Sequence, residues 1–335
     1  MKNRQFKLFQ CCVPVKGIKN GVVIDFQRNT MHKVSNQIID LLEEYSSKDI
    51  YDLFNDFKTS KTILKKHMRY FIENELVIMS DDVDCYSLLE NDFFWPEIVD
   101  TISIEIENLN TDFKEFLEIQ INELGVKSLK LILRKDEIRN FVKISTLLKK
   151  SKIRCVVLYL EYSIEIVKEF QPFVIDDPRV SQVVFYNFNG DLNLEDCDGK
   201  FCFEKSPLEI IFDNKTIESV DDFVLNLNIY NEALQRNLMF NRSVYIDSLG
   251  NVKKHREDVE MYGNIVSIDL VEIVKNKDFK LFWEITKDQI EVCKDCEFRY
   301  ICPDGRIPFK TNSKDHYYKY KTRCKYDPYQ GNWDI

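Results

Sequence analysis

CKDCEFRYIC, from Cys293 to Cys302, holds three cysteines within ten residues, and Cys324 follows in CKYDPYQGNW, so the spacing is C-x2-C-x5-C-x21-C. A C-x2-C turn points two thiolates toward one metal, and further cysteines can complete a four-sulfur cage. Such a cage accepts either a tetrahedral zinc ion or an iron–sulfur cluster. We therefore expect Cys293, Cys296, Cys302 and Cys324 to be metal ligands rather than unrelated thiols of a small apolar subdomain.

The composition of the 335-residue chain is that of a soluble globular protein, with 44% hydrophobic and 31% charged residues. The formal net charge of −9 argues against nucleic acid as a partner, because broad nucleic-acid binding needs a basic surface. The first residues lack the apolar core of a secretory signal, and no apolar run approaches the roughly 18 residues of a membrane span. We expect a cytoplasmic protein with no membrane partner, where clustered cysteines more often bind metal than form disulfides.

The middle of the chain alternates strand and helix patterns. The strand patterns are TISIEIENL (101–109), LKLILR (129–134), IRCVVLYLEY (153–162) and VSQVVFYN (180–187). Strands separated by helices predict a parallel sheet built through right-handed crossovers. About four such units precede a looser region from Gly190 to Pro207. A full barrel has eight units, so we expect an α/β fold with a partial, open barrel over residues 98–240.

The first 82 residues predict a small winged-helix-like unit. Three strand patterns come first, with a hairpin turn ending at Asn20-Gly21. Three amphipathic helix patterns and a closing strand, LVIMSDD, follow. Residues 241–335 differ in character: RSVYIDSLGNVKKH predicts a hairpin turning at Gly250-Asn251, and short helices lead into the cysteine block.

This C-terminal third resembles the SPASM domain of radical-SAM peptide-modifying enzymes, because GNVKKHREDVEMYGNI, CKDCEFRYIC and CKYDPYQGNW occur in that domain's order. The resemblance implies that the four cysteines hold an auxiliary [4Fe–4S] cluster, although the spacing alone also permits zinc. A second auxiliary cluster is common in the family. Its ligand positions here read KKHRED, IVSID and Arg306, so the resemblance implies that this cluster is lost.

The sequence departs from the radical-SAM pattern at the start of the barrel. A radical-SAM enzyme places C-x3-C-x2-C after the first barrel strand, to hold the cluster that cleaves S-adenosylmethionine. The corresponding loop, NTDFKEF (110–116), has no cysteine, and no three cysteines of the chain have that spacing. The sequence therefore predicts a radical-SAM-like protein without radical-SAM chemistry.

Over nearly its full length the chain is similar to the SPASM-domain peptide maturase of grasp-with-spasm systems. FKLFQCCVPVKG, VVIDFQRN and NIYNEALQRNLMFNRSVYIDSLGNV carry this similarity, together with the cysteine block. It implies a role in the biosynthesis of ribosomally made peptides (RiPPs) of the graspetide type, with an ATP-grasp ligase and a precursor peptide as partners. Residues 1–82 would then be a RiPP recognition element.

Such an element binds a leader peptide as an added strand beside its third strand and against its third helix. The residues implied here are Met31, His32, Lys33, Val34, Lys61, Lys65, Met68 and Arg69. The basic residues among them would meet an acidic leader. An ordinary solvated helix face is the alternative for these lysines.

Two functions remain open at this stage. In the first, the chain is an accessory maturase that binds the leader and presents the precursor to the ligase. In the second, it is a redox-active iron–sulfur enzyme that modifies the precursor itself. No catalytic set can be assembled for the second, because His32, His67, His255 and His316 lie in different segments. Whether the chain is an enzyme is therefore undecided by its sequence.

Overall fold

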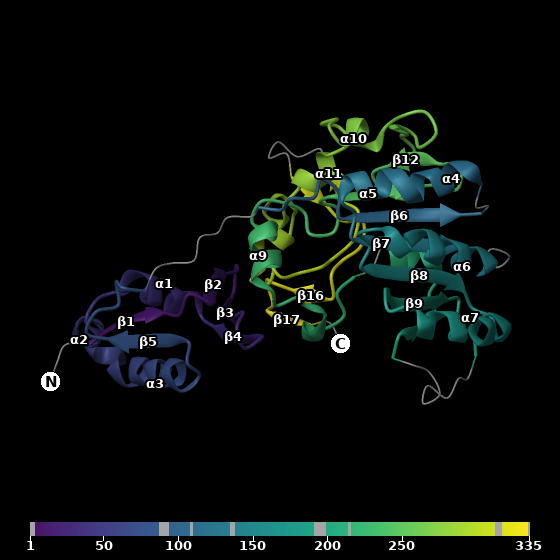
Figure 1. Ribbon diagram of the computed structural model, residues 1–335. Helices are drawn as coiled ribbons and strands as arrows, with labels where there is room; N and C mark the ends of the chain where they lie inside the picture. Colours follow the sequence, from purple (N-terminus) through teal and green to yellow (C-terminus); the bar gives the residue numbers. More distant parts are fainter. Residues whose placement is uncertain are drawn as a thin grey trace.

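The computed structural model describes residues 4–86, 94–107, 110–134, 138–190, 199–213, 216–311 and 317–333. An N-terminal unit lies on one side of the molecule, a large sheet lies on the other, and the C-terminal region lies between them (Figure 1).

One eight-stranded sheet dominates the fold, with the order β10-β9-β8-β7-β6-β11-β12-β13. Its strands are β6 (Thr101–Ile106), β7 (Ser128–Leu133), β8 (Cys155–Glu161), β9 (Val180–Tyr186), β10 (Phe201–Phe203), β11 (Ser243–Ile246), β12 (Asn251–Lys253) and β13 (Gly263–Asn264). The pairings from β10 to β11 are parallel, and β12 and β13 add an antiparallel edge. The α/β class expected from the alternating pattern is confirmed.

The sheet is wider than the sequence pattern indicates. Strand β10 lies in the stretch expected to be loose, because three residues are too few to produce a readable period. Strand β11 forms the expected hairpin with β12, but it also pairs in parallel with β6, joining Val244 to Ile102. The sheet therefore continues past residue 241, and the C-terminal region is joined to it by backbone hydrogen bonds.

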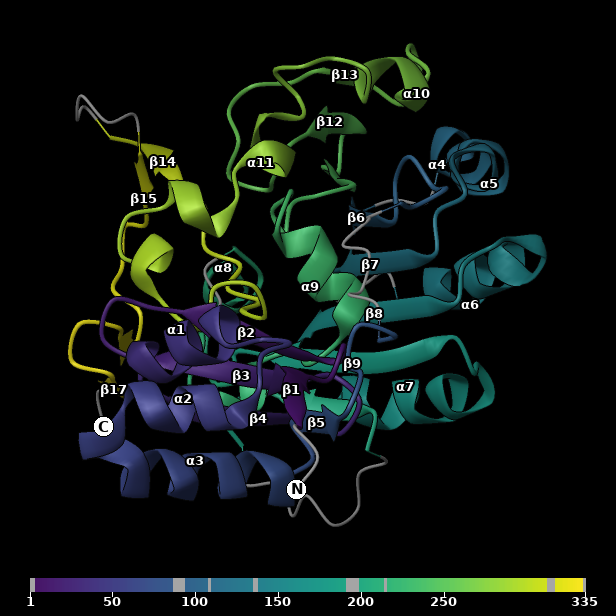
Figure 2. The same ribbon diagram turned by 90° about the vertical axis from the view of Figure 1, so that its left-hand side faces the viewer.

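Helices cover one face of this sheet, as Figure 2 shows for α4 to α7. They are α4 (Thr111–Glu115), a π-helical turn (Phe116–Gln120), α5 (Ile121–Leu124), α6 (Ile138–Leu147) and α7 (Ile164–Asp176). Alternate strand residues such as Ile102, Ile104 and Leu131 are fully buried in the core beneath them. Asn110 caps the first of these helices, and Gly125, with a φ of 74°, ends α5 in the left-handed conformation.

Helix α8 (Leu208–Asp213) packs on part of the opposite face of the sheet. A second apolar cluster forms there from Ile132, Tyr159, Tyr186, Leu208, Ile211, Phe212 and Tyr245. The Tyr159 and Phe212 rings meet edge to face, with centroids 5.1 Å apart. Helix α8 and these aromatic rings thus lie on the face of the sheet opposite α4 to α7.

The N-terminal unit has the elements that its sequence pattern predicts. They are β1 (Gln5–Leu8), β2 (Cys12–Lys16), β3 (Gly21–Asp25), β4 (Thr30–Val34), α1 (Asn36–Glu44), α2 (Ile50–Asp56), α3 (Lys61–Glu73) and β5 (Val77–Ser80). Strands β2, β3 and β4 form an antiparallel sheet, and β1 pairs with β5. The expected first strand is interrupted, because the N–H of Cys12 donates to the carbonyl of Phe9 at 2.9 Å and turns the chain.

The C-terminal region consists of short elements around a small core. They are α9 (Leu227–Ala233), α10 (Leu270–Ile273), α11 (Leu281–Glu284), β14 (Phe309–Lys310), β15 (Tyr318–Lys319), β16 (Tyr326–Asp327) and β17 (Asn332–Trp333). Elements this short cannot be stable alone, so the region needs additional cross-links or neighbours. Among the residues described, no helix combines the length and apolar character needed to cross a bilayer.

The N-terminal sheet packs against this region. One buried cluster contains Val15, Val22 and Ile24 of the hairpin together with Phe298 and Tyr326. Two hydrogen bonds fix the contact: the N–H of Ile18 donates to the carbonyl of Asp295 at 2.7 Å, and the Arg299 guanidinium donates to the carbonyl of Lys16 at 2.8 Å. The β2–β3 hairpin therefore rests directly on the C-x2-C loop.

Candidate metal centre and peptide-binding face

Cys293, Cys296, Cys302 and Cys324 line one cavity of the C-terminal region. Apolar side chains complete its wall, among them those of Phe223 and Trp333. The structure thus gathers the four thiols that the sequence singles out, even though 21 residues separate the last two. We call these four cysteines the tetrad.

The local backbone positions three of the tetrad sulfurs in the same way. Cys293–Asp295 is a 3-10 turn, and the N–H of Cys296 donates to the carbonyl of Cys293 at 3.0 Å. The N–H of Phe298 donates to Sγ of Cys296, and the N–H of Tyr326 donates to Sγ of Cys324, each at 3.4 Å. The backbone N–H of Asp304 likewise donates to Cys302, and it offsets part of the rise that burial causes in the pKa of that thiol. Amide donors two residues after a cysteine stabilise a thiolate and tune a bound metal.

Burial dominates the ionisation of the free thiols. It raises the pKa of Cys293 to about 11 and that of Cys302 to about 12, and it also raises the pKa values of Cys296 and Cys324. Without a metal the tetrad is therefore protonated at neutral pH. A bound metal must displace these protons and supply the positive charge that a buried thiolate requires.

A buried charged network lies behind the tetrad. The Lys287 ammonium, 5% exposed, donates to the hydroxyl of Tyr320 at 2.7 Å and to the carbonyl of Asp304 at 3.2 Å. The Arg306 guanidinium donates to the Asp304 carboxylate at 3.0 Å and lies over the Tyr320 ring at 4.2 Å. Two cations and one carboxylate leave one net positive charge, which opposes the negative charge of thiolates. Sequence reasoning missed Lys287 and Asp304, because isolated charged residues usually indicate surface.

The donor set of the tetrad fits a polynuclear cluster better than a single zinc ion. Among the described residues, no three of the tetrad sulfurs lie within 4.8 Å of one another. Zinc–sulfur bonds of about 2.3 Å in a tetrahedron would bring the sulfurs to about 3.8 Å from one another. A [4Fe–4S] cluster places several metal atoms between its thiolates and so needs a wider cage.

Val292, immediately before the tetrad, has a φ of 68° and a ψ of −47°. A β-branched residue with positive φ is strained, because its Cβ crowds the backbone. The unusual backbone turns the chain from Glu291, whose N–H donates to the carbonyl of Tyr318 at 2.8 Å, into the loop that carries Cys293.

The residues implied in leader binding lie on β4 and α3. Strand β4 pairs with β3 alone among the described strands, so its other edge is open. His32 on β4 and Tyr70 on α3 share a hydrogen bond of 2.7 Å, which places strand and helix side by side. Lys65 and Arg69 of α3 are exposed, and Lys61 at its first turn is half-buried.

Three of the implied residues face the interior. Met68 is 4% and Val34 9% exposed in the core of the N-terminal unit. Met31 packs toward the cluster that joins this unit to the C-terminal region. The Lys33 ammonium donates to the carbonyl of Gly331 at 2.8 Å, which ties β4 to the C-terminal hairpin. The surface that remains for a ligand is the edge of β4 and the exposed side of α3.

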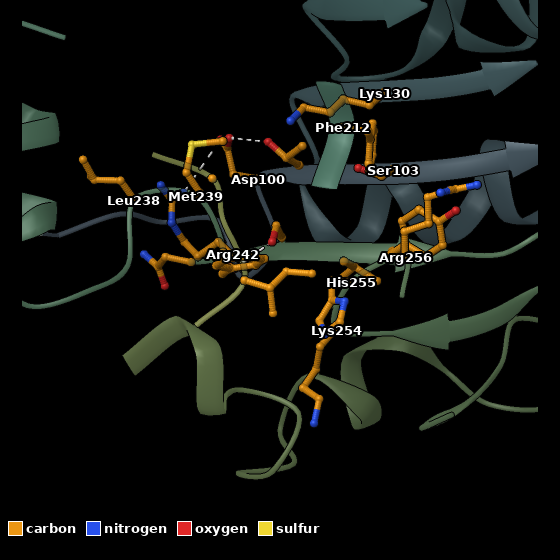
Figure 3. A pocket seen from close by; sticks show the side chains of 18 of the residues that line it. Asp100, Ser103, Lys130, Phe212, Leu238, Met239, Arg242, Lys254, His255 and Arg256 are labelled. Carbon is orange, nitrogen blue, oxygen red and sulfur yellow. Dashed lines mark hydrogen bonds and ion pairs between the residues drawn. The ribbon is translucent and has the colours of Figure 1, made fainter. Parts of the chain in front are cut away.

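A separate cavity of about 290 Å³ lies between the sheet and the C-terminal region (Figure 3). Ser103, Lys130 and Phe212 contribute to its sheet side, whereas the Lys254 side chain points away from Asp100 and Ser103.

Several of its charged groups are engaged in ion pairs. Arg242 lies 3.4 Å from the Glu232 carboxylate, and Arg256 donates to Glu105 at 2.8 Å. Glu161, at the end of another strand, accepts from Asn187 at 3.2 Å.

The histidines do not converge at this cavity. His255 lines it and is stacked on Phe282, and burial lowers its pKa. His32 and His67 belong to the N-terminal unit, and His316 lies outside the described residues. Of the three described histidines, His255 therefore lines this cavity and the other two lie elsewhere.

Comparison with known proteins identifies no family. No family model matches the chain, and no curated protein matches it. Among solved structures, BtrN in complex with AdoMet and 2-DOIA gives a TM-score of 0.37 at 13% identity, covering 65% of this chain and 97% of that one. SuiB of Streptococcus suis bound to S-adenosylmethionine gives 0.35 at 12% identity, covering 95% and 99%. SuiB bound to its precursor peptide SuiA gives 0.28 at 10%, covering 92% and 94%. All three TM-scores are below 0.5, so these likenesses do not establish a shared fold or function.

Proposed function

We propose that the chain is an accessory maturase of RiPP biosynthesis that binds a precursor leader peptide and presents the precursor to an ATP-grasp ligase. In this proposal residues 1–82 are a RiPP recognition element, residues 98–240 a degenerate radical-SAM-like barrel and residues 241–335 a SPASM domain. The full-length resemblance of the sequence to grasp-with-spasm maturases suggests the pathway and the ligase. The observation that carries the binding role is the open edge of β4 beside a basic helix.

The geometry of β4 and α3 supports peptide capture by strand addition. An open strand edge offers unpaired N–H and C=O groups to an extended peptide. Exposed Lys65 and Arg69 add positive charge to α3, the helix that contacts β4 through Tyr70, although the chain as a whole carries a net charge of −9. This local contrast favours an acidic leader.

Two observations support binding rather than radical chemistry. The sequence has no cysteine triplet to hold the cluster that S-adenosylmethionine needs. In addition, Phe212 of α8 and the rings of Tyr159 and Tyr245 fill part of the inner side of the barrel, where such a reaction would require space.

The tetrad then has a structural role. We propose that it holds a [4Fe–4S] cluster, with zinc as the alternative that the wide sulfur spacing disfavours. Four thiolates leave no open coordination position, which favours a structural group over a catalytic one. Such a group would fix the C-x2-C loop, and with it Asp295 and Arg299, against the N-terminal hairpin.

The binding role is tested by calorimetry with the leader peptide and the full chain. We expect saturable binding by the wild type and at least tenfold weaker binding by Lys65→Glu/Arg69→Glu. Lys150→Glu/Lys152→Glu, at exposed positions of the central region, is the matched control and should bind like the wild type. Equal affinity in all three proteins, or no saturable binding by the wild type, would overturn the proposal.

The redox-enzyme alternative is tested by incubating chain and precursor with reductant and S-adenosylmethionine, in the absence of ligase. We expect the mass of the precursor to stay unchanged. A mass change that requires the chain would replace the binding role with an enzymatic one.

A further inference from the structure

A second group of metal-ligating side chains lies in the N-terminal unit, remote from the tetrad. The thiols of Cys11 and Cys12 and the carboxylate of Asp25 have ligand atoms that all lie within 4.8 Å of one another. Cys12 is 3% exposed and Asp25 is fully buried, whereas Cys11 is half-buried. Nothing in the proposed leader-binding function uses this group.

The backbone creates the group through a turn and a strand pairing. The turn between β1 and β2 places Cys11 and Cys12 in succession, and the register of β2 and β3 places Cys12 opposite Asp25. The N–H of Phe26 donates to the carbonyl of Cys11 at 2.9 Å, which holds the turn against the end of β3. The three side chains are therefore brought together by ordered strands rather than by a surface loop alone.

The distance between the two sulfurs suits a single tetrahedral ion. They are 3.9 Å apart, and zinc–sulfur bonds of about 2.3 Å at tetrahedral angles require about 3.8 Å. No three sulfurs of the tetrad lie within 4.8 Å of one another among the described residues, so the two groups of cysteines differ in the size of metal centre that they suit.

The carboxylate is oriented as a metal ligand usually is. Oδ1 of Asp25 accepts from the N–H groups of Gln27 at 2.9 Å and Arg28 at 3.1 Å, and Oδ2 accepts from the Arg28 guanidinium at 3.0 Å. Hydrogen bonds of this kind fix a ligand and are typical of metal sites. The side-chain oxygen of Gln27 lies 3.6 Å from the Cys11 sulfur and, like a water molecule, could complete a fourth coordination position.

The charges of the group balance both with and without a divalent ion. With neutral thiols, Asp25 carries one negative charge and Arg28 carries one positive charge. With two thiolates and a bound divalent ion, three negative charges face three positive ones. Glu75, the second partner of Arg28, is 64% exposed and so lies outside this buried count. Buried groups that are neutral in both states avoid the cost of an uncompensated buried charge.

We propose that Cys11, Cys12 and Asp25 form a binding site for a thiophilic divalent cation of the zinc and cadmium class. Two sulfurs and one oxygen select such an ion over magnesium or calcium, which prefer oxygen ligands alone. The ion would connect the β1–β2 turn to the end of β3. Arg28, which also pairs with Glu75 after α3, would extend that connection to the third helix.

Cadmium is the probe, and the full chain is used after anaerobic purification with a phosphine reductant. After incubation with Cd²⁺ and desalting, the metal content per chain is measured for the wild type, Cys11→Ser, Asp25→Asn and Cys85→Ser. Cys85 is exposed and lies outside both groups of cysteines, so Cys85→Ser is the matched control. The tetrad is intact in all four proteins, and differences between them therefore report on the new site.

We expect the wild type and Cys85→Ser to retain one more cadmium ion per chain than Cys11→Ser. Asp25→Asn should retain this ion at least tenfold more weakly in competition with a chelator. The ¹¹³Cd NMR spectrum should contain a resonance from mixed sulfur and oxygen ligands that Cys11→Ser lacks.

Equal cadmium content in the wild type and Cys11→Ser would overturn the proposal. Circular dichroism identifies a variant that fails to fold. Cys11 is half-buried, so Cys11→Ser is the variant expected to retain the fold, and its result decides the outcome if Asp25→Asn unfolds.

Discussion

At the scale of single residues, strain and buried charge are concentrated around the tetrad. Val292 takes a left-handed conformation directly before Cys293, and Lys287 and Arg306 place two cations behind the sulfurs. Strained residues persist only where the surrounding structure holds them. Here the tetrad loop is fixed by the N-terminal hairpin on one side and by the buried network on the other.

Replacing Val292 with glycine should stabilise the protein by about 1 kcal/mol, because glycine adopts positive φ without a Cβ clash. The midpoint of urea unfolding measures the effect. Val259→Gly is the matched control, since Val259 is 94% exposed and is absent from the residues with positive φ. It should be neutral or destabilising. A lower midpoint for Val292→Gly than for the wild type would show that the strain is not relieved in this way.

At the scale of secondary-structure elements, buried polar contacts join neighbouring elements at defined points. Asp177 follows α7 and is 7% exposed. It accepts from the Arg179 guanidinium at 2.9 and 2.7 Å and from the Ser145 hydroxyl of α6 at 2.6 Å. These bonds lower the pKa of Asp177 to about 2, and the hydrogen bond from the Arg179 side chain has the largest effect.

In the folded protein the pKa of Asp177 is below its ordinary value of 3.8. The ionised carboxylate therefore contributes to the free energy of unfolding above pH 4, and this contribution is lost as the pH falls toward 2. The shift corresponds to about 2 kcal/mol at neutral pH. Asp177→Asn should therefore be about 2 kcal/mol less stable than the wild type at pH 7, and this gap should narrow between about pH 4 and pH 2. Urea unfolding at several pH values measures it, and a gap independent of pH would contradict the assignment.

The contact between the β2–β3 hairpin and the C-x2-C loop leaves no room at Gly17. A Cβ there would lie 2.7 Å from the backbone nitrogen of Glu297 and 2.9 Å from the carbonyl oxygen of Asn20. Gly17→Ala should therefore loosen the hairpin from the loop and speed hydrogen exchange over residues 12–34. Gly199→Ala is the control, because nothing lies within 4 Å of its added Cβ. Unchanged exchange in Gly17→Ala would show that the contact adapts.

At the scale of the whole molecule, the segments that carry the tetrad contact the N-terminal hairpin and so link the two ends of the chain. Lys19 donates to the carbonyl of Gln330 at 2.6 Å, and Ile18 and Lys16 contact the tetrad loop. Loss of a metal that stabilises this small subdomain should therefore affect a part of the molecule that holds none of its ligands.

If the tetrad holds the metal proposed above, its removal with a chelator under anaerobic conditions should lower the melting temperature and increase hydrogen exchange in β2, β3 and β4. Structural zinc in small domains contributes on the order of 10 kcal/mol, which indicates the possible size of the effect. Cys324→Ser should reproduce the change, and Cys155→Ser, a cysteine outside both groups, should not. Exchange that increases only around residues 290–330 would show that the two units are independent.

Much of this architecture could be predicted from local sequence. The helical spacing of Leu64, Met68 and Phe71 predicts α3, and these three residues are buried as the period requires. The sequence singles out Cys293, Cys296, Cys302 and Cys324, and all four line one cavity. That they bind metal remains a prediction.

Contacts between residues that are distant in the sequence could not be predicted from local sequence patterns. The pairing of β11 with β6 joins segments about 140 residues apart, and no local period encodes it. Helix α8 is too short to show which side of the sheet it covers. The buried partners of Lys287 are likewise visible only in three dimensions.

The apolar side of the N-terminal sheet has a consequence during synthesis. Val15, Val22 and Ile24 are covered by Phe298 and Tyr326, which leave the ribosome nearly three hundred residues later. Until then this surface is open to solvent, to chaperones or to a second nascent chain. The N-terminal sheet is therefore fully buried only after the C-terminal segment has folded. A shortage of the metal proposed for the tetrad should appear first as aggregation of newly made protein.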